Sequence, residues 1–286
     1  MNTMQIVWLE QPDCSNPFLV GGKAAGLGKL AAQHPVPPGF CLAARSSVSD
    51  TKISQPRDFT RQLAAAYARL GERCGSDRPR VAVRSSAVDE DGQEASFAGQ
   101  HETYLNVMGA DAVAEAVERC LDSAHSERAT SYRRAHGLTA AGGTGIAVLV
   151  QQLILADVST VVFSADPRTG DRDHVLINAT WGLGESLVGG SVIPDLFVVR
   201  KATLEIVERQ VADKAVMTIA QPAGTREVPT PRFMRTQPAL QDEQIMALAR
   251  LARTLETTEN QPVDLECAYQ QGRLYLLQCR PITTAR

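Results

Sequence analysis

The feature that most constrains the fold of this chain is a pair of apolar runs near its C-terminal end, joined by a short polar connection. The first run spans residues 263–269 and the second spans residues 274–281, with Gln270-Gln271-Gly272-Arg273 between them. Apolar residues alternating on both sides of a glycine-containing connection are typical of a β-hairpin. We therefore predict a hairpin over residues 263–281.

Polar side chains interrupt both strands of this predicted hairpin. Because side chains alternate between the two faces of a strand, Asp264, Glu266 and Ala268 should share one face, as should Gln278 and Arg280. If the two faces coincide, one patch of sheet carries two carboxylates, an amide oxygen and a guanidinium. Carboxylate and amide oxygens suit Mg²⁺, and an arginine beside them suits a phosphate. The alternative is the ordinary polar face of an antiparallel sheet, and the hairpin alone does not decide between the two.

Composition narrows the class of protein. A length of 286 residues indicates one large domain or two lobes, and an apolar fraction of 44% is ordinary for a globular protein. A net charge of −3 gives no electrostatic case for nucleic acid, and no apolar run is long enough for a membrane span. The N-terminal residues do not resemble a signal peptide. Six scattered cysteines without a CxxC pair or zinc-ligand spacing indicate reduced thiols and a cytoplasmic location.

A glycine pair followed by a lysine, Gly21-Gly22-Lys23, precedes a run of helix-forming residues. This order places Lys23 near a helix N-terminus, where backbone N–H groups and a lysine favour anions. The spacing of a P-loop is absent, as is that of a Rossmann fingerprint. Taken alone, the motif is also compatible with a simple loop.

A second candidate phosphate site follows the apolar strand predicted over residues 81–87. Arg84 is followed there by two serines, and an arginine at the end of a buried strand is costly unless it is paired. An acidic run, residues 89–91, comes next, and then the small and aromatic residues Ser96-Phe97-Ala98-Gly99-Gln100. Small residues of this kind are typical of a loop that covers a phosphate.

The remaining pattern predicts a mixed chain of helices and strands. Helices are predicted over 58–70, 111–136 and 241–255. Strands are predicted over 101–107, 146–155, 161–165, 174–179, 196–200 and 204–211, with a glycine-rich passage at 182–190 and an exposed loop over 220–238. The glycine-rich residues 141–145 are the candidate joint between an N-terminal lobe, 1–143, and a C-terminal lobe, 144–286. A strand at such a joint, carrying Gln151 and Gln152, is placed to offer backbone groups to an adenine ring.

Several stretches together resemble one family. They are Gly-Gly-Lys-Ala-Ala-Gly-Leu-Gly at 21–28, Val-Arg-Ser-Ser-Ala at 83–87, Ser-Phe-Ala-Gly-Gln-His-Glu-Thr-Tyr-Leu-Asn-Val at 96–107, Ala-Asp-Pro-Arg-Thr-Gly at 165–170, Gly-Leu-Gly-Glu-Ser at 182–186 and Gln-Cys-Arg-Pro-Ile-Thr at 278–283. This set is similar to the ATP-binding domain of phosphoenolpyruvate synthase, pyruvate phosphate dikinase and rifampicin phosphotransferase. The motifs occur in the family order and extend over nearly the whole chain.

The resemblance implies an α+β, ATP-grasp-like fold in which ATP lies in the cleft between two lobes. It also implies a role for each matching residue. Lys23, Arg84 and Arg280 would act on phosphates as catalytic residues, and Gly99 and Thr103 would belong to the phosphate-covering loop. Gln151 would lie on the adenine-side strand, with backbone groups of Gln152, Leu153 and Ile154 nearby. Glu266 and Gln278 would bind Mg²⁺, and Asp264 would orient Glu266 or Arg280.

Family members cleave ATP to AMP and pass one phosphoryl group to a histidine on a separate, swivelling domain. No stretch of this chain resembles that domain or the acceptor domain, and none of its five histidines lies in the family's phosphohistidine motif. The leading hypothesis is therefore an ATP-binding, phosphoryl-donating module that acts on a histidine domain or partner protein. Two alternatives stay open: a kinase that phosphorylates a small molecule directly and yields ADP, and a nucleotide-binding subunit without chemistry. The sequence does not name the final acceptor.

Overall fold

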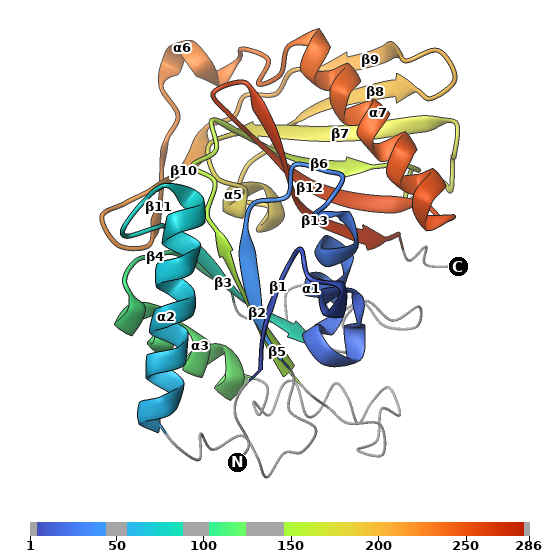
Figure 1. The fold of residues 1–286 in the computed structure, drawn as a ribbon. Coiled ribbons are helices and arrows are strands. Elements are labelled where there is room, and N and C mark those ends of the chain that lie inside the picture. Colours follow the sequence, from blue (N-terminus) through green and yellow to red (C-terminus); the bar gives the residue numbers. More distant parts are fainter. Residues whose placement is uncertain (1–4, 44–55, 88–102, 124–145, 283–286) are drawn as a thin grey trace. The chain divides into compact units, whose positions relative to one another are not determined.

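The computed structural model of this chain describes residues 5–43, 56–87, 103–123 and 146–282. The chain divides into two compact units, Met1–Leu153 and Ile154–Arg286. Each unit is built on an antiparallel sheet, so the predicted mixture of helices and strands is confirmed (Figure 1). Within the described ranges, no helix combines the length and the apolar character needed to cross a membrane. All six cysteines are free thiols.

The first unit contains a five-stranded sheet in the order β1-β2-β5-β3-β4, in which each neighbouring pair is antiparallel. Its strands are β1 (Ile6–Trp8), β2 (Gly39–Leu42), β3 (Val81–Ala87), β4 (Thr103–Val107) and β5 (Ile146–Gln152). Its helices are η1 (Pro12–Ser15), α1 (Pro17–Leu30), α2 (Pro56–Cys74) and α3 (Ala110–Ser123). Both α2 and α3 are amphipathic, so each has one apolar face that can pack against the sheet.

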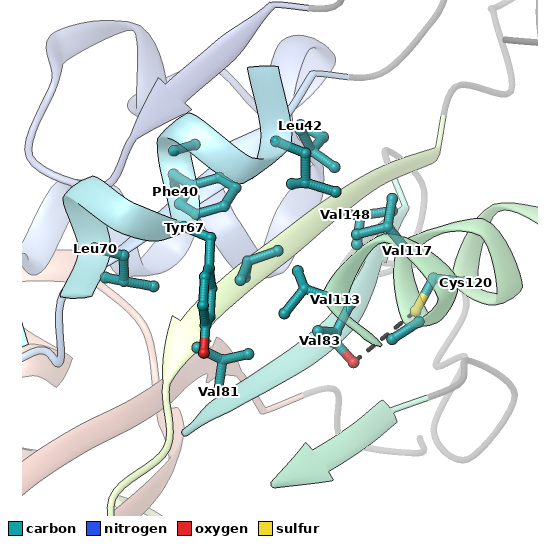
Figure 2. Close-up of a cluster of buried hydrophobic side chains, with 14 of the residues drawn as sticks. Phe40, Leu42, Tyr67, Leu70, Val81, Val83, Val113, Val117, Cys120 and Val148 are labelled. Carbon is teal, nitrogen blue, oxygen red and sulfur yellow. Dashed lines mark hydrogen bonds between the residues drawn. The ribbon is translucent and has the colours of Figure 1, made fainter. Parts of the chain in front are cut away.

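The apolar core of this unit lies between one face of the sheet and the helices α2 and α3 (Figure 2). Strand residues of this face point towards the helices, and the Cys120 thiol of α3 donates to the Val83 carbonyl oxygen at 3.9 Å. The side chains that form the core include Phe40, Leu42, Tyr67, Leu70, Val81, Val83, Val113, Val117 and Val148. Burial of this face fixes which strand residues point the other way.

The opposite face of the same sheet carries α1. Cys41 of β2 donates its thiol to the carbonyl oxygen of Val20 in α1 at 3.4 Å. The cross-strand register places Cys41 beside Leu149, Leu149 beside Arg84, and Arg84 beside Thr103. Directly paired residues of an antiparallel sheet share a face, so Arg84 and Thr103 lie on the α1 side of the sheet.

The boundary between the two units differs from the sequence prediction. β5 pairs with both β2 and β3, so it is a central strand of the first sheet. The boundary therefore follows Leu153, ten residues after the predicted position at 143/144. The glycine-rich stretch 141–145, which suggested the earlier boundary, lies outside the described residues.

The second unit contains a six-stranded antiparallel sheet in the order β13-β12-β6-β7-β8-β9. Its strands are β6 (Val158–Phe163), β7 (His174–Trp181), β8 (Asp195–Arg200), β9 (Glu205–Gln210), β12 (Val263–Gln270) and β13 (Arg273–Pro281). The helix α7 (Asp242–Glu259) lies along this sheet (Figure 1), and Tyr269 of β12 donates its hydroxyl to the Gln244 carbonyl oxygen at 3.1 Å. One row across the sheet is fully buried on this side: Leu265, Val162, Ile177 and Phe197.

The predicted loop over 220–238 is wrong. Residues on either side of Gly224 form a separate hairpin, β10 (Val216–Ala220) and β11 (Thr225–Pro229), followed by the short helix α6 (Arg232–Arg235). Both strands have few buried side chains, so their sequences lack the apolar alternation that would have indicated strands. The hairpin joins the end of β7 through a bridge between Gly182 and Thr218.

The C-terminal hairpin is confirmed and has a two-residue turn. Gln271 and Gly272 have φ values of 50° and 77°, and two positive φ values are those of a type I′ turn, which matches the twist of the strands. The register pairs Asp264 with Arg280 and Glu266 with Gln278, with an irregularity after Glu266. Asp264 and Glu266 therefore lie on the same face of β12, as predicted from the sequence.

Candidate functional site

Glu266 and Gln278 face each other across β12 and β13. Tyr269 and Leu265 show that the odd-numbered residues of β12 point towards α7, so Glu266 points to the other side of the sheet. Gln278 is buried and Glu266 is partly buried. The two side chains therefore place a carboxylate and an amide next to one another on the sheet face that α7 does not cover.

Asp264 and Arg280 form the next cross-strand pair on the same face. The guanidinium donates from Nε to Asp264 Oδ2 at 2.9 Å, and Nη2 lies 2.9 Å from the same oxygen. Burial raises the pKa of Asp264, Arg280 lowers that pKa in part, and the Glu266 carboxylate raises it again. The second oxygen, Oδ1, is buried without a hydrogen-bond partner in the described part of the chain.

These four residues form the patch predicted from the hairpin. The patch supplies carboxylate and amide oxygens, which are hard ligands, and one cation held against a carboxylate. Among the described residues, no group of three or more His, Cys, Asp or Glu is arranged to hold a metal ion. Mg²⁺ is commonly held by one or two protein oxygens together with substrate phosphates, so the Glu266–Gln278 pair fits that ion as part of a shared site.

In the first unit, Lys23 lies just after an interruption of α1. Gly21 has φ 76° and ψ 167°, which is not helical, so a new helical segment begins after it. Lys23 is thus close to a helix start, as predicted, although α1 as a whole begins earlier, at Pro17. Its ammonium donates to the carbonyl oxygen of Ser85 in β3 at 3.4 Å.

The structure brings three of the predicted phosphate residues to one face of the first sheet. Arg84 precedes the Ser85 carbonyl that receives Lys23, and Thr103 is paired directly with Arg84 across β3 and β4. All three lie on the side of the sheet that carries α1. Gly99 and the rest of the predicted phosphate-covering loop before residue 103 lie outside the described residues.

The predicted adenine-side residues lie at the end of β5 and just after it: Gln151 and Gln152 are its last two residues, and Leu153 and Ile154 follow. The side-chain amide of Gln151 donates to the Pro37 carbonyl oxygen at 3.1 Å, and the side chain is buried. The backbone N–H groups of Gln152 and Leu153 donate to the carbonyl oxygens of Pro38 and Arg80. The N–H of Ile154 donates to no group in the described ranges.

Two other sequence features have a structural explanation. The glycine-rich passage at 182–190 was predicted to let a ligand approach the backbone, but at Gly182 the approaching group is the Thr218 carbonyl oxygen, 2.3 Å from an ideal Cβ. Ser86, to which the sequence gave no role, accepts a hydrogen bond from the Ala24 N–H of α1 at 3.2 Å. A serine inside a buried strand was the available signal, because a buried hydroxyl needs a partner.

Comparisons with known proteins agree on one family. Residues 43–286 match the family described as pyruvate phosphate dikinase, AMP/ATP-binding domain. A probable phosphoenolpyruvate synthase of Methanocaldococcus jannaschii is 36% identical over 319 residues, which cover 98% of this chain and 27% of that protein. The prodigiosin synthesizing transferase PigC of Serratia marcescens is 39% identical, and the match covers 99% of this chain and 34% of that protein. The rifampicin phosphotransferase of Streptomyces sviceus is 36% identical, and the match covers 96% of this chain and 35% of that protein.

The chain spans less than half the length of each of these relatives. Among solved structures, D-alanyl-alanine synthetase A from Vibrio cholerae aligns at 14% identity with a TM-score of 0.36, covering 91% of this chain and 58% of that one. The family assignment rests on the sequence matches and not on this structural alignment.

Proposed function

We propose, since the chain belongs to the family of pyruvate phosphate dikinase AMP/ATP-binding domains, that it binds Mg²⁺ and ATP and donates a phosphoryl group to a histidine on a separate domain or partner protein. The observation that carries this proposal is the pairing of Glu266 with Gln278 beside the Asp264–Arg280 pair. An ordinary polar sheet face does not need a buried amide, a partly buried carboxylate and an anchored guanidinium side by side.

In this proposal, Glu266 and Gln278 hold Mg²⁺ through their side-chain oxygens. The ion, when bound, neutralises and orients phosphate oxygens for transfer. Arg280, whose guanidinium is held by Asp264, contacts a phosphate. Because the guanidinium is already oriented, little reorganisation is needed when negative charge develops in the transition state.

Lys23 and Arg84 supply the other phosphate contacts, with Thr103 and Gly99 at the phosphate-covering loop. Lys23 and Arg84 are supported by their position on one sheet face of the first unit. The adenine ring would lie against the stretch from Gln151 to Ile154.

The acceptor is proposed to be a histidine that the described residues do not provide. An imidazole that attacks a phosphorus atom needs no general base from this chain, because a neutral ring nitrogen is already nucleophilic. Relatives named phosphoenolpyruvate synthase and rifampicin phosphotransferase are at least twice as long as this chain, so there is room in them for acceptor domains.

The test combines binding and transfer measurements on the full chain. Calorimetry should show ATP binding that strengthens with Mg²⁺, and ATP labelled in its phosphoryl groups should label a histidine-domain protein of the family. Glu266→Ala should abolish label transfer while ATP binding is only weakened, and Glu243→Ala, at an exposed position of α7, should leave both unchanged. Product analysis separates the dikinase route, which yields AMP, from direct phosphorylation, which yields ADP. Transfer at the wild-type rate by Glu266→Ala would overturn the metal assignment, and no ATP consumption with any partner would overturn the proposal.

A further inference from the structure

Helix α1 is interrupted where it meets strand β3. At Gly21 the backbone takes φ 76° and ψ 167°, a combination that L side chains rarely adopt. An ideal Cβ on this residue would lie 2.1 Å from the Ser86 carbonyl oxygen and 2.3 Å from the Ser86 hydroxyl oxygen. Position 21 therefore requires glycine for two reasons, the backbone conformation and the close approach of β3.

The new helical segment after Gly21 needs an N-terminal cap. The first N–H groups of a helix lack intrahelical acceptors, and a Ser, Thr, Asp or Asn side chain at the N-cap usually accepts from the second or third of them. Gly21 stands at the N-cap and has no side chain. Ser86 supplies the missing acceptor from another element, since its hydroxyl oxygen lies 3.2 Å from the Ala24 nitrogen. The Ser86 side chain is fully buried, so water does not compete for this bond.

This arrangement determines where Lys23 lies. Lys23 is two residues after Gly21 and directly precedes Ala24, so it stands between the close contact and the capped N–H. Its ammonium reaches the Ser85 carbonyl oxygen at 3.4 Å. Three consecutive residues of β3 thus take part: Arg84 contributes a cation, Ser85 receives Lys23, and Ser86 caps the helix that carries Lys23.

We propose that Ser86, together with Gly21, is a positioning residue that fixes Lys23 relative to Arg84 for binding ATP phosphates. The proposal rests on the function proposed above for Lys23 and Arg84. Ser86 acts through the helix backbone and touches no phosphate itself. When the Ser86 hydroxyl is lost, Lys23 and Arg84 are both still present, but the distance between their charged groups is no longer fixed.

The test compares phosphate-dependent binding with binding of the nucleoside alone. In Ser86→Ala, the dissociation constant for ATP with Mg²⁺ should rise by about five- to tenfold, the size expected when a helix cap is lost. The dissociation constant for adenosine should stay unchanged, because no phosphate is involved. Ser86→Thr keeps the acceptor oxygen and should restore ATP binding to within about threefold of wild type.

Two further variants keep the test decisive. Ser86→Cys has a similar shape but a poor acceptor, so it should reproduce the loss of ATP affinity if Ser86→Ala does not fold. Ser123→Ala removes a serine whose hydroxyl donates to the Cys120 carbonyl oxygen in α3, and it should bind ATP like wild type. Thermal unfolding of each variant checks that the first unit is folded.

The outcomes separate this inference from the function on which it rests. If wild-type protein does not bind ATP, the proposed function fails. If wild type binds ATP and Lys23→Ala weakens it, but Ser86→Ala and Ser86→Cys bind like wild type, the positioning role alone is overturned. An equal loss of adenosine and ATP affinity in the Ser86 variants, or unchanged ATP affinity in Lys23→Ala, also overturns it.

Discussion

Arg280 contacts a single carboxylate oxygen of Asp264, Oδ2. Both Nε and Nη2 of the guanidinium lie 2.9 Å from Oδ2, whereas Oδ1 is buried and has no partner in the described ranges. The pair spans neighbouring positions of β12 and β13. A carboxylate that contacts two nitrogens of one guanidinium restrains the plane of that group, so Asp264 helps to set the orientation of Arg280.

The first prediction concerns this orientation. Asp264→Asn keeps the shape of the side chain but loses the charge, so it should weaken binding of ATP with Mg²⁺ by about tenfold, equal to about 1.4 kcal/mol. Calorimetric titration measures the dissociation constant directly. Asp242→Asn is the matched control, because Asp242 pairs with Arg209 on the surface of the same unit and should leave the affinity unchanged. Wild-type affinity in Asp264→Asn would show that Arg280 needs no anchor.

The second prediction concerns a buried ion pair in the second unit. Lys214 and Asp195 are both fully buried, and the ammonium donates to Asp195 Oδ1 at 2.5 Å and to the Ala212 carbonyl oxygen at 3.0 Å. Asp195 also accepts the backbone N–H groups of Ala212 and Ala239. Lys214→Met leaves the carboxylate buried without its cation, and urea unfolding should show a loss of about 3–5 kcal/mol.

A double variant tests whether the two buried charges stabilise each other. Asp195→Asn should also be strongly destabilising, since it leaves the lysine without its anion. Lys214→Met combined with Asp195→Asn should cost less than the sum of the two single changes, because neither charge then remains buried and unpaired. Strict additivity of the two losses would contradict the interpretation that the two charges stabilise each other.

The third prediction concerns the glycine at the end of β7. Gly182 has φ 77°, and an added Cβ would lie 2.3 Å from the Thr218 carbonyl oxygen. Gly170 has a similar φ of 76° but nothing within 4 Å of its ideal Cβ. Gly170→Ala should therefore cost about 1 kcal/mol through backbone strain alone, and Gly182→Ala should cost clearly more. Similar midpoints of urea unfolding for the two variants would show that the Thr218 contact adjusts without cost.

The sequence predicted the parts of the site that depend on local periodicity. Alternation along 263–281 predicted that Glu266 shares a face with Asp264 and that Gln278 shares a face with Arg280, but it left open whether the two faces coincide. The register of β12 and β13 shows that they do, with Glu266 opposite Gln278. It did not predict contacts between distant segments, such as Ser86 with Ala24, since a serine in a strand has many possible partners. The boundary after Leu153 was missed for the same reason, because only strand pairing shows that β5 belongs with β2 and β3.

The fourth prediction concerns the dependence of stability on pH. The side-chain hydrogen bond from Arg235 lowers the pKa of Asp213 below its ordinary value of 3.8, and the charge of Arg235 lowers it further. A carboxyl with a lowered folded-state pKa stabilises the protein above the unfolded pKa, and this contribution is lost as the pH falls through the folded pKa.

The difference in unfolding free energy between wild type and Asp213→Asn should thus be largest above pH 4 and shrink as the pH falls below 3.8. Urea unfolding at a series of pH values measures it. In the background of Arg235→Gln, the pH dependence of the Asp213→Asn effect should largely disappear. A difference that grows as the pH falls would contradict the assigned cause of the shift.

The fifth prediction concerns the turn that joins the two strands of the candidate metal site. Gln271 has φ 50°, a left-handed conformation that costs most residues energy but that asparagine adopts readily. Its backbone N–H donates to Asp157 Oδ2 at 2.6 Å, and substitution of the side chain does not remove this bond. Gln271→Asn gives the Asn-Gly sequence favoured in type I′ turns and should stabilise the second unit by about 0.5 kcal/mol.

Thermal unfolding and urea titration measure this gain, and two variants test its cause. Gln271→Ala keeps an unfavourable residue at the left-handed position, so it should not stabilise the protein. Gly272→Ala, at φ 77° with open space around its ideal Cβ, should destabilise it by about 1 kcal/mol. If Gln271→Asn and Gln271→Ala raise the midpoint equally, the gain does not come from the turn conformation. Because the turn sets the register that places Glu266 opposite Gln278, ATP affinity should remain unchanged in Gln271→Asn.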